Sequence, residues 1–146
     1  MCPVRERVED LIGLLQENLR SYTTLLELAE EIHDEMRRGT LDGIAEKMAR
    51  REQIQEEISG RDRLITGIRK GVPRILPDQR IDDLVDRSVT LATAIQGVDQ
   101  RTRKLMEEEQ ARLREGIATL RQGRKMMRGY GKSGAGGRPR FLDRRG

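Results

Sequence analysis

The chain has 146 residues, of which 37% are charged and 35% are apolar, with two tyrosines, one phenylalanine and no tryptophan. This length fits one domain, at roughly 100–200 residues per domain. So few large apolar residues exclude a compact globule with a thick core. Two classes remain: a disordered chain, and a set of long helices that each need a single apolar stripe.

The sequence also predicts the compartment. The single cysteine, Cys2, has no partner in the chain for a disulfide. No run approaches the roughly 18–20 apolar residues of a membrane span, so we expect no stable membrane insertion. The charged start of the chain lacks the apolar region of a signal peptide. A cytoplasmic protein is therefore expected.

Charge is distributed unevenly along the chain. Residues 121–146 hold nine basic residues and one acidic residue, whereas residues 1–120 hold 20 basic and 24 acidic residues. The net charge of +4 therefore combines a mildly acidic body with a basic C-terminal segment. Such asymmetry predicts an acidic partner for that segment.

The apolar residues between Val4 and Met36 recur at helical spacing and predict one long amphipathic helix. The stripe consists of Val8, Leu11, Ile12, Leu15, Asn18, Leu19, Tyr22, Leu25, Leu26, Ala29, Ile32 and Met36. Gly39 suits a left-handed cap after this helix, and Thr40 is a fair N-cap for the next one. So short a break predicts an antiparallel hairpin.

A second helix is predicted over about residues 41–70, with a weaker stripe that thins around Ile54. The stripe consists of Leu41, Ile44, Ala45, Met48, Ile58, Ile65 and Ile68. Glycine and two prolines between Gly71 and Pro77 end this helix. Asp78 is the predicted N-cap of a third helix over residues 78–128. Its stripe consists of Ile81, Leu84, Val85, Val89, Leu91, Ala92, Ile95, Val98, Leu105, Met106, Leu113, Ile117, Leu120 and Met127.

The third helix would be about 75 Å long, which exceeds the roughly 50 Å of the first helix by about half. Either it bends at Gly97 or its C-terminal turns extend past the bundle. In the second case several apolar residues lack an internal partner and form a candidate docking strip for another helix. These residues are Leu113, Ile117, Leu120, Met126 and Met127.

The predicted fold is all-α: a long antiparallel helical hairpin or open bundle of three to four helices with a flexible C-terminal tail. Residues 1–128 form the helical bundle in this prediction, and residues 129–146 form a flexible, basic, glycine-rich tail.

We find no constellation for catalysis, a cofactor or a metal. The glycines of Gly129-x-Gly131-x-x-Gly134 match a dinucleotide fingerprint, but they follow a helix and are not placed to open one. Glu30-x-x-His33 resembles half of a di-iron ligand set, which needs two histidines, and the chain has one. The chain is therefore predicted not to be an enzyme.

The chain resembles the FlgN family of flagellar type III export chaperones. The resemblance is carried by the N-terminal helix over residues 11–30, by the break Arg38-Gly39-Thr40-Leu41-Asp42, and by the third helix running into Gly129-Tyr130-Gly131. The basic tail that ends in Phe141-Leu142-Asp143-Arg144-Arg145 also fits.

This resemblance implies a cytoplasmic, non-enzymatic chaperone of hook-associated (hook–filament junction) proteins. Such a chaperone binds their C-terminal helical regions, prevents premature assembly and delivers them to the type III export gate. The residues expected to bind the client are Leu105, Leu113, Ile117, Leu120 and Met127. Tyr130 is the candidate for docking to the flagellar export apparatus.

The sequence also allows other roles for these residues and for the protein. The same apolar residues also suit the core of a bundle, and Tyr130 also suits a bundle cap. The protein as a whole also fits a structural coiled-coil adaptor whose apolar faces are used in self-association, for instance as a homodimer. A nucleic-acid-binding accessory protein that uses the basic tail is a further alternative, although the acidic body argues against nucleic acid.

Overall fold

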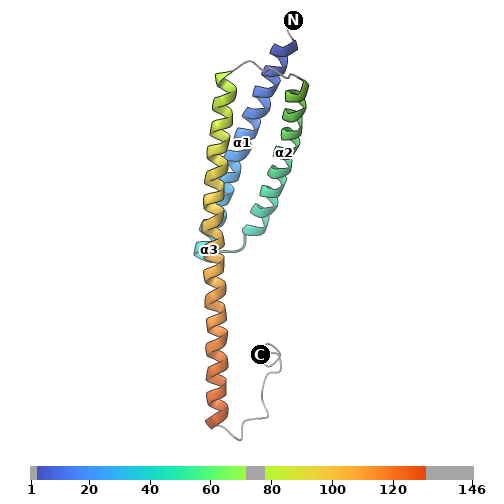
Figure 1. Ribbon diagram of the computed structural model, residues 1–146. Coiled ribbons are helices and arrows are strands. Elements are labelled where there is room, and N and C mark those ends of the chain that lie inside the picture. The colour runs from blue at the N-terminus through green and yellow to red at the C-terminus, as the bar shows by residue number, and fades with distance from the viewer. Residues whose placement is uncertain (1–2, 72–77, 131–146) are drawn as a thin grey trace. The chain divides into compact units, whose positions relative to one another are not determined.

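A computed structural model of the chain describes residues 3–71 and 78–130, which form three helices and no strand (Figure 1). The helices are α1 (Pro3–Arg38), α2 (Ile44–Gly71) and α3 (Gln79–Tyr130). The predicted all-α class is confirmed. The predicted flexible tail beyond residue 130 lies outside the described residues.

The chain divides into two compact units, residues 1–105 and residues 106–146. In the first unit, α1, α2 and the beginning of α3 lie side by side, with α2 antiparallel to the other two helices (Figure 1). The described part of the second unit is the remainder of α3. Helix α3 is continuous from Gln79 to Tyr130, so Gly97 does not interrupt it.

The corner between α1 and α2 is closed by backbone bonds. Gly39 has a φ of 75°, and its N–H donates to the carbonyl of Met36 at 3.2 Å. The left-handed cap predicted at Gly39 is therefore confirmed. The backbone N–H of Thr40 donates to the carbonyl of Glu35 at 3.0 Å, and α2 begins only at Ile44. Thr40 therefore closes the first helix, and its prediction as the N-cap of the second was wrong.

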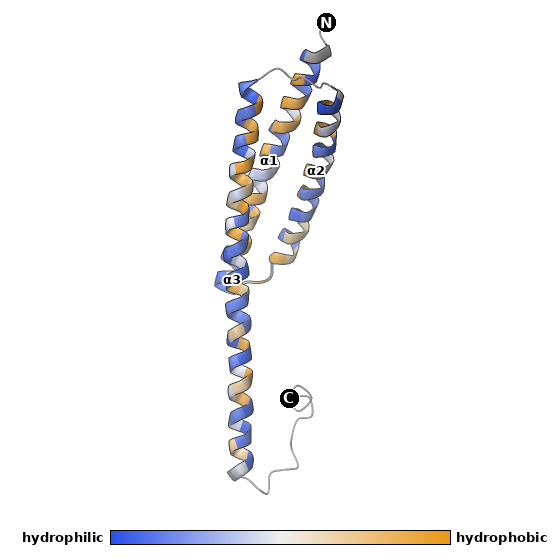
Figure 2. Ribbon diagram, viewed as in Figure 1, coloured by the Kyte–Doolittle hydropathy of each residue, from blue (hydrophilic) through white to orange (hydrophobic). Residues whose placement is uncertain are grey.

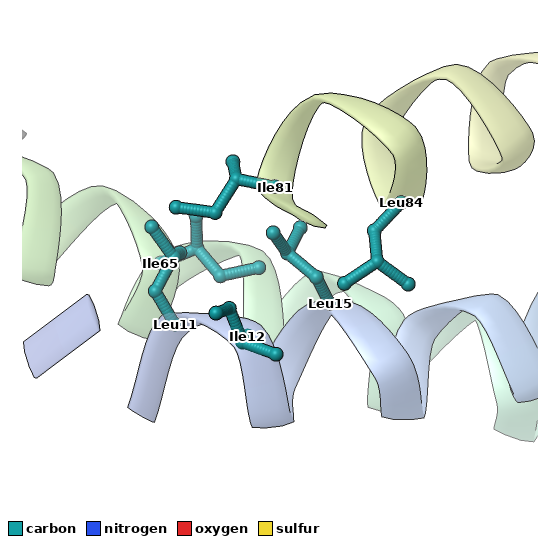
Figure 3. Close-up of a cluster of buried hydrophobic side chains, with 6 residues drawn as sticks. All are labelled: Leu11, Ile12, Leu15, Ile65, Ile81 and Leu84. Carbon is teal, nitrogen blue, oxygen red and sulfur yellow. The ribbon is translucent and has the colours of Figure 1, made fainter. Parts of the chain in front are cut away.

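The core of the first unit consists of two clusters of buried apolar side chains, each with contributions from all three helices. The first comprises Leu11, Ile12, Leu15, Ile65, Ile81 and Leu84 (Figure 3). The second comprises Leu25, Ala29, Ile54, Ile58, Ile95 and Val98. Between them along α1 lies Asn18, which is 4% exposed and donates to Asp62 Oδ1 at 3.1 Å. The stripe predicted for the first helix is confirmed by its buried members.

The face that α2 turns to the core differs from the predicted one. The residues on this face are spaced alternately by three and four: Ile44, Lys47, Arg51, Ile54, Ile58, Arg61, Ile65 and Ile68. Three of these eight residues are basic. Lys47 bonds Glu35 on α1 at 2.6 Å, and Arg51 bonds Asp99 on α3 at 2.7 and 2.8 Å. The aliphatic stems of such residues cover apolar neighbours while their charged ends are paired.

In the first unit, four residues predicted on apolar stripes are exposed: Leu41, Ala45, Met48 and Val89. For Met48 the reason is that paired cations occupy inward positions of α2, whereas Leu41 precedes α2 and lies in the corner after α1. Ile54, placed where the predicted stripe thins, is 2% exposed and is one of the two most buried large side chains.

Candidate helix-binding surface

The second unit presents an exposed helical surface. Every residue from Met106 to Leu120 is exposed, and apolar residues are interspersed with charged ones along this part of α3 (Figure 2). The predicted client-binding residues Leu113 and Leu120 are 62% and 69% exposed, and Ile117 and Met127 are exposed as well. Their exposure fits a docking surface and argues against the alternative that they form bundle core.

Five of these apolar residues form one strip. Met106, Leu113, Leu120 and Met127 are spaced by seven residues, and Ile117 lies four residues after Leu113 and three before Leu120. At 3.6 residues per turn this spacing places all five on one face of the helix. We call this set, Met106, Leu113, Ile117, Leu120 and Met127, the distal strip. Met126 is also exposed, but it lies about 140° away from the centre of the strip.

The structure changes the set of client-binding residues predicted from the sequence at two positions. Leu105 belongs to the first unit and is half-buried, whereas the other four predicted residues belong to the second unit and are exposed. Met106 was not among the predicted client-binding residues, yet it continues the strip. Its distance of seven residues from Leu113 is the signal that identifies it.

The distal strip lies on about the same side of α3 as the residues that this helix buries in the bundle. In the first unit, positions Ile81, Ser88, Ile95 and Thr102 recur at intervals of seven. The same interval leads next to Glu109, Gly116 and Gly123, whereas the strip starts four residues after Thr102. A strict seven-residue repeat drifts by about 20° per heptad on a straight helix, and the four-residue step offsets this drift. The strip therefore continues the apolar side of α3 beyond the buried clusters of the first unit.

Charged residues and glycines border the strip differently on its two sides. One border carries Glu107, Arg114, Arg121 and Arg128, and the other carries Glu109, Gly116 and Gly123. Arg124 lies within the strip, between Leu120 and Met127. A Cβ atom built on Gly116 or Gly123 meets no atom within 4 Å. The glycine border therefore leaves room for a close approach to the helix backbone.

His33 has a structural contact. Its Nδ1 lies 3.2 Å from Thr102 Oγ1, and that hydroxyl donates its proton to the carbonyl of Val98 at 3.1 Å. The histidine must therefore donate to the threonine through Nδ1–H. Within residues 3–71 and 78–130, no group of three or more histidine, cysteine, aspartate or glutamate side chains is placed to hold a metal ion.

A groove of about 380 Å³ lies between α1 and the start of α3. Its floor includes the buried residues Ile12 and Leu84, and its rim includes Glu9 and Arg80. Arg80 Nη2 donates to Glu9 Oε1 at 3.1 Å and to Asp78 Oδ2 at 2.9 Å. Because these groups pair with one another, the groove presents packing and ion pairs but no activated nucleophile.

Comparison with known proteins decides the family. The family model described as "Flagellar protein FliT" matches residues 19–132, a span that contains the whole distal strip. The chain belongs to the FliT family. FliT proteins are flagellar export chaperones, and the family is not an enzyme family.

The family predicted from the sequence, FlgN, is not confirmed, because FlgN is a related but different family of chaperones. Its resemblance to this FliT-family chain lay in a long amphipathic helix and a short helical corner, which many helical hairpins share. No curated protein and no solved structure matches the chain. No described helix is both long and apolar enough to cross a membrane.

Proposed function

We propose that this FliT-family chain is a cytoplasmic export chaperone for a hook-associated (hook–filament junction) subunit. It binds the C-terminal helical region of that subunit, prevents premature assembly and delivers the subunit to the type III export gate. The observation that carries this proposal is the distal strip, an exposed apolar face on a helix of a chain that belongs to a family of flagellar export chaperones.

The dimensions of the distal strip suit a helical client. From Met106 to Met127 the strip spans 22 residues, or about 33 Å along the helix axis. An amphipathic helix of three heptads has this length and places apolar residues at the same spacing. Methionines at both ends add adaptable side chains, which suit a surface that must release its client again.

The test measures binding of the full chain to a purified hook-associated subunit by calorimetry. We expect a complex for the wild type and a loss of affinity of at least about 100-fold for the double variant Leu113→Asp/Leu120→Asp, because two carboxylates would then enter an apolar contact. Met126→Asp is the matched control. Met126 is 62% exposed on a different face of the same helix, so this variant should bind as the wild type does.

Because the strip residues are exposed, none of these variants should change the melting temperature of the bundle. A wild-type chain that forms no complex with any hook-associated subunit contradicts the proposed client. Equal weakening by the strip variant and by Met126→Asp contradicts the proposed surface.

Tyr130, the last residue of α3, is the proposed docking residue for the export apparatus. Its position at the end of the helix leaves the strip available to the client. We expect Tyr130→Ala to retain client affinity and to lower binding to purified export-apparatus components in a pull-down. A variant that loses the client as well assigns Tyr130 to the client surface instead.

A further inference from the structure

We propose that the first part of α2, residues 44–53, is a latch that two ion pairs hold closed over the apolar side chain of Ile32. When salt screens these pairs, the latch opens while the rest of the bundle stays folded. The latch belongs to the first unit and is independent of the distal strip.

The latch lacks the burial that holds the rest of α2. The buried residues of α2 are Ile54, Ile58 and Ile65, and all three lie beyond the latch. Within residues 41–53 every residue is exposed or half-buried. Burial of apolar surface is the dominant favourable contribution to folding. A segment of about three helical turns that buries none of its residues therefore opens at a lower free energy than its neighbours.

Two cations fasten the latch to the other helices. Lys47 Nζ lies 2.6 Å from Glu35 Oε1 and 3.9 Å from Glu31 Oε2, both on α1. Arg51 donates two parallel hydrogen bonds, at 2.7 and 2.8 Å, to the carboxylate of Asp99 on α3. The side chains of Lys47 and Arg51 are only 27% and 12% exposed. Charge pairing therefore holds this part of α2 where apolar burial does not.

Ile32 is the side chain that the latch covers. It is 3% exposed, yet it belongs to neither core cluster. Glu31 and Glu35, the partners of Lys47, lie beside Ile32 on α1, and this places the aliphatic stem of Lys47 next to it. Opening of the latch therefore exposes an apolar residue that the closed form protects.

The other two helices remain joined at this level when the latch opens. His33 on α1 and Thr102 on α3 are hydrogen-bonded at 3.2 Å, and this contact does not involve α2. Beyond the latch, Ile54 and Ile58 hold the rest of α2 in the second core cluster. The opening is therefore local and does not require the bundle to unfold.

The test measures hydrogen–deuterium exchange of the full chain by mass spectrometry in 0.1 M and 1 M sodium chloride. The screening length falls from about 10 Å to about 3 Å between these concentrations. We expect the amides of residues 44–53 to exchange about three- to tenfold faster at 1 M salt, and those of residues 54–65 to keep their rate, because burial protects them. Equal acceleration of the two segments, or no acceleration of the first, overturns the latch.

Neighbouring arginines provide matched variants. Arg51→Gln should accelerate exchange of residues 44–53 about three- to tenfold at 0.1 M salt and remove most of the salt effect. Arg50→Gln makes the same change in charge at an exposed residue that bonds only Gln53, one turn away, and should behave as the wild type does. Asp99→Asn should act as Arg51→Gln does, and the double variant should exchange no faster than either. Equal effects of Arg50→Gln and Arg51→Gln contradict the proposal.

Thiol labelling tests what the latch covers. In a Cys2→Ser background, Ile32→Cys should react with a thiol reagent about three- to tenfold faster at 1 M salt than at 0.1 M salt. Leu25→Cys, within the second core cluster, is the control and should not respond to salt. If both cysteines respond equally, the whole bundle opens and the latch is overturned. If neither responds, the latch does not cover Ile32.

Discussion

At the scale of single residues, the most informative side chain in the bundle is Asn18. It occupies a position of the apolar stripe of α1 but bonds to polar groups of α2: its amide donates to Asp62, and its carbonyl oxygen accepts from Arg61 Nη1 at 3.3 Å. Arg61 also donates to Ser21 Oγ at 2.8 Å and pairs with Glu17. A polar contact of this kind within an apolar seam fixes the register of neighbouring helices.

We expect Asn18→Ala to lower the free energy of unfolding by about 1–3 kcal/mol, because Arg61 and Asp62 each lose a partner in a partly buried layer. Thr23→Ala is the control, since Thr23 is exposed and its hydroxyl bonds only to the carbonyl of Leu19, one turn earlier. The control should change stability by less than about 0.5 kcal/mol in urea unfolding. Equal stability of both variants would contradict a structural role for the Asn18 contact.

Asp78 makes a contribution to the stability of the fold that depends on pH. The hydrogen bond from the Arg80 side chain, aided by the Arg80 backbone N–H, holds the pKa of Asp78 below its ordinary value of 3.8. The folded chain therefore releases this proton at a lower pH than the unfolded chain does. The stabilisation is complete above about pH 4 and is lost as the pH falls through the folded-state pKa.

Asp78→Asn retains a capping oxygen but does not titrate. We expect the wild type to be the more stable protein at pH 7 and the difference to close as the pH approaches 2. Urea unfolding of both proteins at several pH values provides the measurement. A stability difference that is constant from pH 7 to pH 2 would show that the Asp78 carboxylate does not stabilise the cap of α3.

At the scale of elements, α2 is the helix in which the apolar spacing of the sequence and the observed burial of side chains disagree. Ile54 is 2% exposed, whereas Met48, predicted on the apolar stripe, is 50% exposed. We expect Ile54→Ala to cost about 2–5 kcal/mol of stability and Met48→Ala less than about 0.5 kcal/mol. Chemical unfolding of the two variants checks this. If Met48→Ala is the more destabilising variant, the predicted stripe is right and the observed face of α2 is wrong.

The inward face of α1 could be predicted better than that of α2, and the reason is physical. In α1 the stripe is almost entirely apolar, so spacing alone identifies the inward face and even places Asn18 on it. In α2 the inward face includes Lys47, Arg51 and Arg61, whose charges are paired with residues of α1 and α3. Periodicity treats a cation as a solvent-facing residue, and it cannot identify a partner that lies elsewhere in the chain. The face of α2 was therefore only partly predictable.

The distal strip was also only partly predictable from the sequence. Sequence spacing predicted an apolar face near the end of the third helix, including Leu113, Ile117 and Leu120. It did not separate Leu105 from that face, because the apolar spacing continues through residue 105 without a gap. The division at residue 105 depends on which residues have neighbours from α1 and α2, and this is a property of the fold.

At the scale of the whole molecule, the first unit has an apolar core, whereas the described residues of the second unit, 106–130, contribute to neither core cluster. Both core clusters draw on residues within 1–105 alone. In the second unit, residues 106–120 of α3 are exposed, and Gly116 and Gly123 weaken the helix further. A helix of this length without packing is only marginally stable in water. We therefore expect the two units to unfold separately.

On heating, circular dichroism of the full chain should show a gradual loss of helix from the second unit, followed by a cooperative transition of the first. A chain truncated after Leu105 should retain the cooperative transition with the same midpoint, because it keeps both core clusters, and should lack the gradual phase. Addition of a bound client helix should move the gradual phase of the full chain to higher temperature, since a ligand that binds only the folded form stabilises it. A truncated chain that melts several degrees lower than the full chain would mean that residues beyond Leu105 stabilise the bundle, and the distal strip would then have an occupant within its own chain.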